Sequence, residues 1–273
     1  MRGLSIVGAG HVGSALGRLF HTAGVFDVRG VLARSAASAA QGSAFIGAGT
    51  ATFDVAALPA ADVYMLAVTD DQIVPACATL VASRPLQGAI VFHCSGALSS
   101  GALEAARLAG AATASVHPIR SFADPAAVAA DFAGTFCGIE GDAAALAVLA
   151  PALEAIGGRP VTIDAAAKTV YHAASVFASN YLVTVLDTAL RAYQAAGIPA
   201  DMARELARPL AQESLSNVFR MGPEQALSGP IARGDYTTVQ RQQAAVSAWD
   251  AEAGALYAAL VPPTAALAAR KPR

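Results

Sequence analysis

Short apolar runs rich in β-branched residues alternate with alanine-rich segments over the first 163 residues of the chain. Segments such as HVGSALGRLFHTAG and DQIVPACATLVAS have the length and composition of helices. Strands that alternate with such helices predict βαβ units and a mostly parallel sheet covered on both faces. We therefore expect a doubly wound α/β domain over residues 1–163. Seven runs are its candidate strands: LSIVGA, DVRGVLA, DVYMLAV, AIVFHC, TASVH, TFCGIE and PVTI.

The strand pattern stops after Ile163, and helical patterns continue from there. Residues 165–197 read as one long helix. We expect it to end at Gly197, because glycine with Pro199 just beyond it is a common stop signal. Further helices are predicted over residues 200–220, 224–227 and 237–260. We therefore expect an all-helical domain over residues 164–273.

Composition narrows the classes of partner. Hydrophobic residues make up 55% of the chain, charged residues only 14%, and the net charge is −2. Such a chain is not a disordered protein. No block of lysine and arginine offers a footprint for phosphates, so we expect no nucleic-acid partner. No cluster of histidine and cysteine has the spacing of metal ligands, so we expect no metal.

Two features indicate a cytoplasmic protein without a membrane partner. The cysteines, Cys77, Cys94 and Cys137, are three in number and lie in apolar runs, which suits reduced and buried thiols. The uncharged stretch 169–186 nearly reaches the length of a transmembrane helix. The histidine, asparagine, serines and tyrosines within it favour a buried helix of a soluble protein instead.

A glycine-rich loop, GAGHVG, follows the first predicted strand and opens the first helix. Gly8 permits the tight turn, Gly10 lets the backbone approach a pyrophosphate, and Gly13 allows close packing of helix on strand. The helix N-terminus, at His11 and Val12, presents free N–H groups to the phosphates. Alternating strands and helices around the loop supply the context that the motif requires. We expect a Rossmann dinucleotide-binding domain; a glycine-rich turn without a ligand is the alternative.

The end of the second predicted strand bears on the choice of cofactor. An NAD-dependent enzyme usually has Asp or Glu about 20 residues after the last glycine, to bind the ribose hydroxyls. This chain has Arg34 and Ser35 instead. Arg34 can bind a 2′-phosphate with several donors, and Ser35 can add another. We therefore expect NADP (NADPH) as the cofactor; an exposed arginine that opens a helix is the alternative.

Ligands of Rossmann domains bind outside the carboxyl ends of the strands. Val68 and Thr69 stand at one such end, Ser95 at a second and His117 at a third. We expect all four beside the cofactor, although Thr69 could cap a helix and Ser95 could be a turn residue. In the HCSG run that contains Ser95, the histidine and the cysteine point to opposite faces of a strand, so only one of them faces the cofactor.

Five motifs distributed over nearly the whole chain point to a family: GAGHVG, HCSG, SVHPIRSF, YHAASVFASNYLVTVLD and ALSGPIARGDYTTV. With them the chain resembles bacterial Rossmann-like proteins that are considered NADP-dependent oxidoreductases and carry a C-terminal helical domain of unknown function. The resemblance implies the same two-domain architecture. The chain departs from the family pattern after the last motif, where Gln242 and Gln243 stand in place of the usual His-Leu pair.

The wider relatives of that family look like pyrroline-5-carboxylate reductases, β-hydroxyacid dehydrogenases and prephenate dehydrogenases. The β-hydroxyacid group is similar in having a lysine on its first interdomain helix, with asparagine four residues later. Here Lys168 matches the lysine, and His172 stands at the asparagine position. The prephenate group is similar in pairing a serine after one strand with His-Pro after the next, as Ser95 and His117-Pro118 do.

A homodimer through the helical domain is expected on two grounds. Helices 165–197 and 237–260 carry more apolar surface than one small helical domain can bury. In the relatives the helical domain, of the 6-phosphogluconate dehydrogenase C-terminal type, often dimerises. Their active sites often borrow residues from the second subunit, and Arg233 and Asp235 are candidates for that role or for shaping a turn.

The helix predicted after residue 164 carries a polar stripe. Four residues spaced i, i+4, i+7 and i+11 share one face of an α-helix: Lys168, His172, Ser175 and Ser179. Asn180 lies about a quarter-turn away. Such a stripe either lines a site or consists of core residues satisfied by nearby carbonyls. A buried lysine is rarely of the second kind, so we expect the stripe to line the substrate site.

The leading hypothesis is an NADP-dependent oxidoreductase that moves hydride to or from a small carbonyl, hydroxy-acid or imine substrate. His172 and Lys168 are the candidate proton donors. Asn180 and Ser179 are expected to orient the substrate, and His117 to flank the nicotinamide. The alternative is a non-catalytic NADP-binding sensor, which would need no proton donor beside the cofactor.

Overall fold

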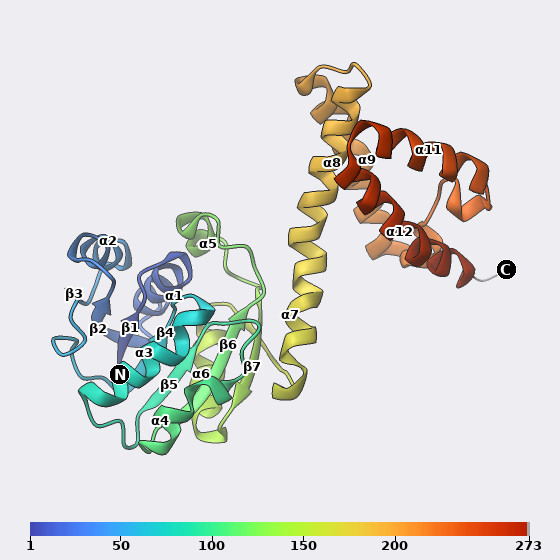
Figure 1. Ribbon diagram of the computed structural model, residues 1–273. Coiled ribbons are helices and arrows are strands. Elements are labelled where there is room, and N and C mark those ends of the chain that lie inside the picture. Colours follow the sequence, from blue (N-terminus) through green and yellow to red (C-terminus); the bar gives the residue numbers. More distant parts are fainter. Residues whose placement is uncertain (272–273) are drawn as a thin grey trace. The chain divides into compact units, whose positions relative to one another are not determined.

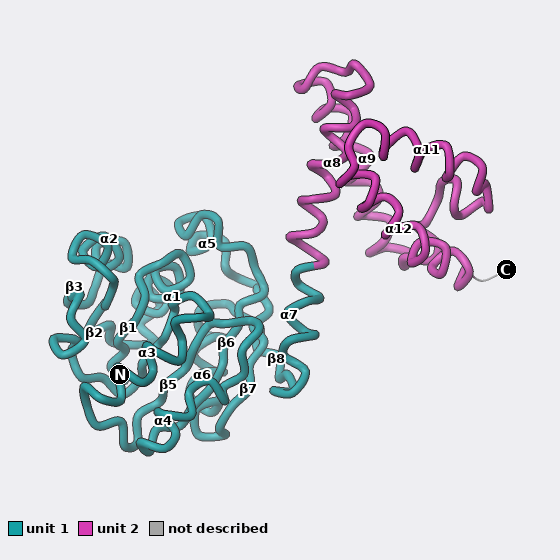
Figure 2. The backbone as a smooth tube through the Cα atoms, viewed as in Figure 1, with its two compact units in different colours: residues 1–176 teal, residues 177–273 magenta. Residues whose placement is uncertain are grey.

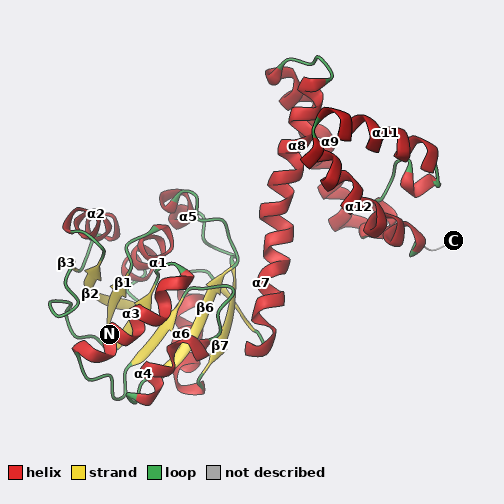
Figure 3. Ribbon diagram, viewed as in Figure 1, coloured by secondary structure: helices red, strands yellow, loops and turns green. Residues whose placement is uncertain are grey.

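The structure, a computed structural model, describes residues 1–271 and divides into two compact units, Met1–Val176 and Phe177–Arg273 (Figure 2). All strands of the described chain lie in the first unit, and the second is helical (Figure 3). The predicted α/β Rossmann domain and the helical C-terminal region are confirmed. The unit boundary falls later than the predicted 163/164, because the first turns of the following helix pack on the first unit through buried Lys168.

Eight strands form one sheet in the order β3-β2-β1-β4-β5-β6-β7-β8 (Figure 1). Neighbouring strands are parallel except β6 and β7, which are antiparallel. All seven predicted strands are present. The additional strand, β3, has only three residues, TAT, which gave no apolar run to detect. The strands are β1 (Arg2–Val7), β2 (Phe26–Leu32), β3 (Thr50–Thr52), β4 (Val63–Leu66), β5 (Ile90–His93), β6 (Ala112–Pro118), β7 (Phe136–Gly141) and β8 (Arg159–Thr162).

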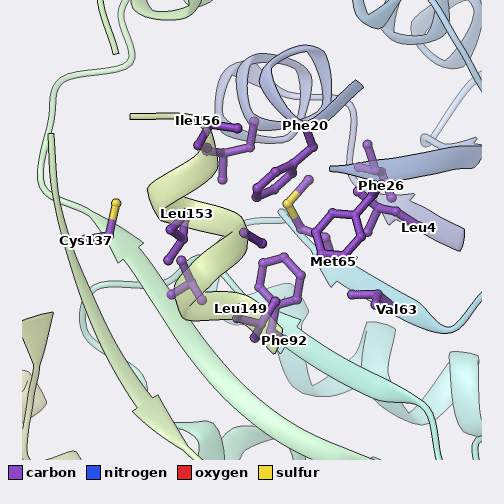
Figure 4. Packing of buried hydrophobic residues seen from close by; sticks show 14 of the residues in the cluster. Leu4, Phe20, Phe26, Val63, Met65, Phe92, Cys137, Leu149, Leu153 and Ile156 are labelled. Carbon is purple, nitrogen blue, oxygen red and sulfur yellow. The ribbon is translucent and has the colours of Figure 1, made fainter. Parts of the chain in front are cut away.

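The first unit also holds the α-helices α1 (His11–Thr22), α2 (Ala36–Ile46), α3 (Asp70–Ser83), α4 (Glu104–Leu108), α5 (Pro125–Ala130), α6 (Ala143–Ala155) and α7 (Lys168–Val176). They build one apolar core on each face of the sheet. In the first core, Phe20 of α1 and Leu149 and Leu153 of α6 lie over the strand residues Met65 and Phe92 (Figure 4). Apolar residues of α3 and α4 form the second core. The sheet is therefore covered on both sides, and its functional groups are left at the strand ends.

The second unit consists of a π-helical turn (Phe177–Tyr181), α8 (Leu182–Ala195), α9 (Ala200–Met221), α10 (Pro223–Ala226), a 3₁₀ turn (Ile231–Arg233), α11 (Tyr236–Trp249) and α12 (Ala251–Ala269). Two helix predictions were wrong in detail. The helix predicted over 165–197 is interrupted by the π-helical turn, whose wider spacing ends the 3.6-residue period on which the polar stripe was drawn. The helix predicted over 237–260 is two helices, because the Asp250 side chain caps a new one by accepting from Ala253 N.

Much apolar surface of the second unit is uncovered in the single chain. No residue of α8 is buried, and Val183 and Phe219 are 65% and 86% exposed. The stretch Ala165–Ala195 is long and apolar enough to cross a membrane by length and composition alone, and none of its most apolar window is buried. This finding differs from the expected buried helix.

Candidate active site

The glycine loop joins β1 to α1, and its glycines differ in what the protein demands of them. Gly8 has a φ of +108°, and a Cβ there would lie 2.5 Å from the carbonyl oxygen of Ala67. A Cβ on Gly13 would lie 2.0 Å from the carbonyl oxygen of Gly8. Both positions therefore require glycine for the fold itself. A Cβ on Gly10 would meet no atom within 4 Å, so this position is open to an approaching ligand.

The same loop opens α1 with free backbone donors. Gly10 is the N-cap and supplies no side-chain cap, and the first turn contains no acidic residue. The N–H groups near His11 and Val12 thus keep the positive end of the helix available for an anion. The His11 side chain is engaged elsewhere, since its Nδ1 lies 2.6 Å from the carbonyl oxygen of Phe122. These features fit the pyrophosphate of a dinucleotide.

The loop between β2 and α2 holds the predicted 2′-phosphate residues. Arg34 and Ser35 are both exposed. Ser35 caps α2, and its Oγ accepts from Ser38 N at 3.2 Å and contacts Ser38 Oγ at 3.0 Å. The helix packs beside the glycine loop, because a Cβ on Gly42 would lie 2.5 Å from the side chain of Ala9. Gly8 N also donates to the carbonyl oxygen of Leu32 at 2.8 Å, so β2 ends beside the dinucleotide loop. Exposed Arg34 and the N-terminus of α2 follow within a few residues, and the connecting segment 33–35 contains no carboxylate.

A cavity of about 260 Å³ lies at the carboxyl ends of β4, β5 and β6. It brings together the predicted site residues Val12, Val68, Ser95, His117 and His172. Neighbouring residues of the same strand ends also line it, namely Ala67, Asp70, Cys94, Gly96 and Pro118, and two residues that were not predicted, Arg120 and Phe122, complete the lining.

Other predicted site residues lie outside this lining. Thr69 is exposed at the N-cap position of α3, the alternative that its sequence context left open. Ser179 and Asn180 are exposed on the π-helical turn of the second unit. Lys168 is 1% exposed and does not border the cavity.

The histidine and the cysteine of HCSG do point in opposite directions. Cys94 borders the cavity, whereas His93 is fully buried. His93 Nδ1 accepts from Ser95 N at 3.1 Å, so its proton lies on Nε2, which donates to the carbonyl oxygen of Ser99 at 3.0 Å. Burial lowers the pKa of His93. Ser95 Oγ in turn accepts from two backbone N–H groups, those of Ala97 and Leu98. His93 and Ser95 thus shape the loop, and the Ser95 hydroxyl is largely used in the turn.

Lys168 belongs to a buried polar network behind the cavity wall. Its Nζ donates to the carbonyl oxygen of Ser95 at 2.9 Å and to Ser115 Oγ, and lies 4.0 Å from Glu140 Oε1. Glu140, on β7, also accepts from the backbone N and the Oγ of Ser100, both at 2.7 Å. Burial lowers the pKa of Lys168 to about 8, although Glu140 acts in the opposite direction. The lysine therefore holds the Ser95 loop and does not face the cavity as the stripe predicted, because Glu140 holds its ammonium group behind the wall.

Three rings meet beside the cavity, of which two, His117 and His172, line it. His117 Nδ1 lies 2.9 Å from Tyr171 Oη, and the His117 ring packs edge to face on both Tyr171 and His172, with centroids 5.6 Å apart in each pair. Glycines make the room: a Cβ on Gly96 would lie 2.3 Å from His172 Cδ2, and one on Gly138 would lie 2.4 Å from Tyr171 Oη. Burial first, and then the charges of His172 and Lys168, lower the pKa of His117 to about 4, so that its ring is neutral near pH 7.

Four residues in or beside the site were not predicted from the sequence: Tyr171, Glu140, Arg120 and Phe122. Tyr171 directly precedes His172, and Arg120 and Phe122 belong to the SVHPIRSF motif, so a motif-wide reading could have included them. Glu140 ends an ordinary apolar strand, and nothing in its sequence context indicates a buried partner for Lys168. Within residues 1–271, no group of three His, Cys, Asp or Glu residues is placed to hold a metal ion.

Comparison with known proteins agrees with this architecture. Residues 2–118 match the Rossmann-like domain, and residues 135–264 match a domain of unknown function, DUF2520. The chain thus carries a Rossmann-like domain followed by a DUF2520 domain, which confirms the resemblance drawn from its motifs. No curated protein matches the sequence.

Solved structures share the fold over nearly the whole chain. A candidate NADP oxidoreductase from Bacteroides fragilis is 20% identical, with a TM-score of 0.80 over 97% of this chain and 98% of that chain. A protein from Thermotoga maritima is 27% identical, with a TM-score of 0.75 over 99% and 100% of the two chains. An imine reductase from Myxococcus stipitatus, solved with NADP⁺, is 18% identical, with a TM-score of 0.70 over 93% and 91%. These likenesses establish the fold.

Proposed function

We propose that the protein is an NADP-dependent oxidoreductase that transfers hydride to or from a small carbonyl, hydroxy-acid or imine substrate. The observation that carries the proposal is the cavity at the ends of β4, β5 and β6. It joins the glycine loop, through Val12, to two imidazoles, His117 and His172. A dinucleotide loop beside side chains able to move a proton is the combination that hydride transfer requires.

The dinucleotide would be held by groups that the chain leaves open. Backbone N–H groups at the start of α1 would bind the pyrophosphate, and the open face of Gly10 would admit it. Arg34 would bind a 2′-phosphate, which favours NADP over NAD. When bound, the cofactor supplies or accepts the hydride; the residues around the cavity orient the substrate and supply a proton.

The proton-donating groups are proposed to be His117 and His172. Both border the cavity, and within residues 1–271 neither His117 Nε2 nor either ring nitrogen of His172 makes a hydrogen bond to protein. Lys168 contributes indirectly, because its ammonium group holds the Ser95 carbonyl and keeps the loop above it in place. The proposal that Ser179 and Asn180 orient the substrate remains a prediction.

We also propose a homodimer formed through the second unit. A groove of about 590 Å³ runs between α8, α11 and α12, and its lining is mostly apolar, with Val185, Val246, Leu256 and Leu260 among its residues. A second copy of the chain would cover this groove and the exposed residues of α8. Arg233 lies on the 3₁₀ turn, and Asp235 caps α11 by accepting from Thr238 N, so both residues shape this turn. A contribution of either residue to the active site of a second subunit stays a prediction.

A panel of ketones, α-keto acids and cyclic imines, incubated with NADPH and followed at the absorbance of the reduced nicotinamide, tests the proposal. Oxidation of NADPH that depends on both enzyme and substrate is the expected result. Tight NADPH binding without turnover on any member of the panel would favour the sensor alternative. Failure to bind NADPH would overturn both.

A further inference from the structure

Tyr171, which the proposed mechanism does not use, has its hydroxyl placed against one nitrogen of His117. The phenol Oη lies 2.9 Å from His117 Nδ1, and the two rings meet at 87°. Within residues 1–271 this is the one hydrogen bond that the phenol makes, and the one that the His117 ring makes. The other ring nitrogen, Nε2, lies on the side of Gly96, where a Cβ would be 2.7 Å away, and the residue borders the cavity.

The direction of this hydrogen bond follows from which groups are available. A neutral imidazole has one N–H donor and one bare nitrogen acceptor. The phenol hydrogen needs an acceptor; its oxygen lies close to Gly138, and within residues 1–271 its one hydrogen-bond partner is His117 Nδ1. If Nδ1 carried the ring proton, the phenol hydrogen would have no protein partner within the described residues, whereas an Nε2–H belongs to a residue that borders the cavity and can bind a ligand there. Tyr171 Oη–H therefore donates to Nδ1, and the proton of His117 lies on Nε2.

We propose that Tyr171 locks His117 in the tautomer that presents Nε2–H to the cavity, and that the site is thereby built for a carbonyl oxygen rather than for a protonated imine. This inference rests on the proposed oxidoreductase function. A carbonyl oxygen accepts the Nε2–H bond. A protonated imine presents its own N–H, so two donors would face each other at the His117 ring, whose one bare nitrogen, Nδ1, is already bonded to Tyr171.

The same arrangement allows a balanced proton transfer during reduction of the carbonyl. As hydride reaches the carbonyl carbon, the C=O π electron pair moves to the oxygen, which takes the proton from His117 Nε2. Nδ1 then takes the phenolic proton, so the ring stays neutral and the charge resides on Tyr171 oxygen until solvent returns a proton. Burial raises the pKa of Tyr171 to about 12, so the phenol holds its proton before the reaction. Asp70, His172 and Lys168 are the charged or titratable groups whose fields act on the His117 ring.

Nitrogen-15 NMR of protein with labelled histidine tests the tautomer without substrate or turnover. The chain has five histidines, and the His117 signals are identified by their loss in His117→Asn. At pH 7 the parent is expected to show a bare Nδ1 and a protonated Nε2. Tyr171→Phe keeps the ring and should shift His117 toward a mixture of tautomers, whereas Tyr236→Phe, in the second unit and 49% exposed, should leave it unchanged. A parent spectrum with the proton on Nδ1 would overturn the inference even if the variant fails to fold.

Kinetics test the consequence for substrate. NADPH oxidation is expected with ketones or α-keto acids and not with cyclic imines that are protonated at pH 7. In Tyr171→Phe, kcat should fall roughly 100-fold with NADPH affinity unchanged. Turnover of protonated imines in preference to carbonyls would overturn the substrate assignment and leave the oxidoreductase function standing. Absence of any turnover would count against the proposed function, and the tautomer would still be decided by the NMR spectrum.

Discussion

The two units differ in how far they bury their apolar residues. The first encloses two cores, one on each face of its sheet, and residues such as Phe92 and Met65 are fully buried. The second leaves apolar side chains such as Val183 and Phe219 mostly exposed. Burial of apolar surface is the main favourable term in folding, so the first unit gains it within one chain, whereas the second leaves apolar surface that the proposed second copy would cover. Although both units are rich in alanine, they therefore differ in how much of their apolar surface a single chain buries.

Helix α7 shows a contrast in burial within a few residues. Its only buried residue is a charged one, Lys168, whereas its valine Val170 is 77% exposed. The buried lysine has Glu140 and two oxygen acceptors to satisfy it. The exposed valine is left without cover in the single chain. On the side of α7 that faces the sheet, the ion pair of Lys168 with Glu140 holds the helix in place. On the other side, Val170 can still pack against another apolar surface.

The largest expected effect concerns the site that the first unit builds. His117→Ala and His172→Ala should each lower the rate on a substrate from the panel by roughly 10²–10⁴-fold, because each removes a candidate proton donor. NADPH affinity, measured by fluorescence titration, should stay at the parental value. His21→Ala, at an exposed histidine far along α1, is the matched control and should keep the parental rate. Near-parental turnover in both variants would place the chemistry elsewhere.

The buried network of the first unit predicts a large loss of stability. Lys168→Ala leaves the Glu140 carboxylate buried without its cation, and the free energy of unfolding should fall by about 3–5 kcal/mol. The double variant Lys168→Met/Glu140→Gln removes both charges and should recover much of that loss. Arg107→Ala breaks only an exposed pair with Glu104 and should change little in urea denaturation. A loss in Lys168→Ala as small as that of the Arg107 variant would contradict the buried ion pair.

The second unit predicts a loss of association. Leu256→Glu places a charge in the apolar groove between α8, α11 and α12 and should weaken dimerisation roughly 100- to 1000-fold, since an unpaired charge resists burial. Leu108→Glu, at a residue of the first unit that is 75% exposed, is the control and should not change the association state. Light scattering across a dilution series measures both. A parent that is monomeric at micromolar concentration would refute the dimer.

Acid should destabilise the first unit through His117. Its pKa is about 4 when folded, against an ordinary value near 6.5, so above pH 6.5 the ring is neutral in both states and contributes nothing. Between pH 6.5 and 4 the unfolded chain binds more protons, and stability falls as the pH falls, by on the order of 2–3 kcal/mol at pH 4. His117→Gln should flatten this part of the curve of unfolding free energy against pH, and His21→Gln should not. Equal slopes in the two variants would argue against a neutral buried His117.

The smallest expected effect is on the affinity for NADPH relative to NADH. Arg34→Ala should weaken NADPH binding about ten- to a hundredfold by removing a charge-assisted phosphate contact, and should leave NADH binding almost unchanged. Calorimetric titration of both cofactors measures the difference. Arg29→Ala, at an exposed arginine of β2 paired with Asp27, is the control. Equal affinity of the parent for NADPH and NADH would remove the role assigned to Arg34.

The strands, the glycine loop and the strand-end residues were predictable from the sequence because they are local. Period, turn chemistry and spacing within a few residues place seven strands, Gly8 and Gly13, and they bring Val68, Ser95 and His117 to one edge of the sheet. The position of His172 beside that edge also agrees with its helix following the last strand.

Partners distant in the sequence were decided only by the tertiary structure. Glu140 and Lys168 lie 28 positions apart, and His117 and Tyr171 lie 54 apart, so no local period relates them. The polar stripe predicted one face for Lys168, His172 and Ser179. Glu140 instead holds the lysine ammonium behind the cavity wall, and the π-helical turn breaks the spacing before Ser179. The helical period shows which side chains share a face. Which of them reach the site depends on the groups packed against that face, because a buried charge needs an opposite charge or hydrogen-bond partners close by.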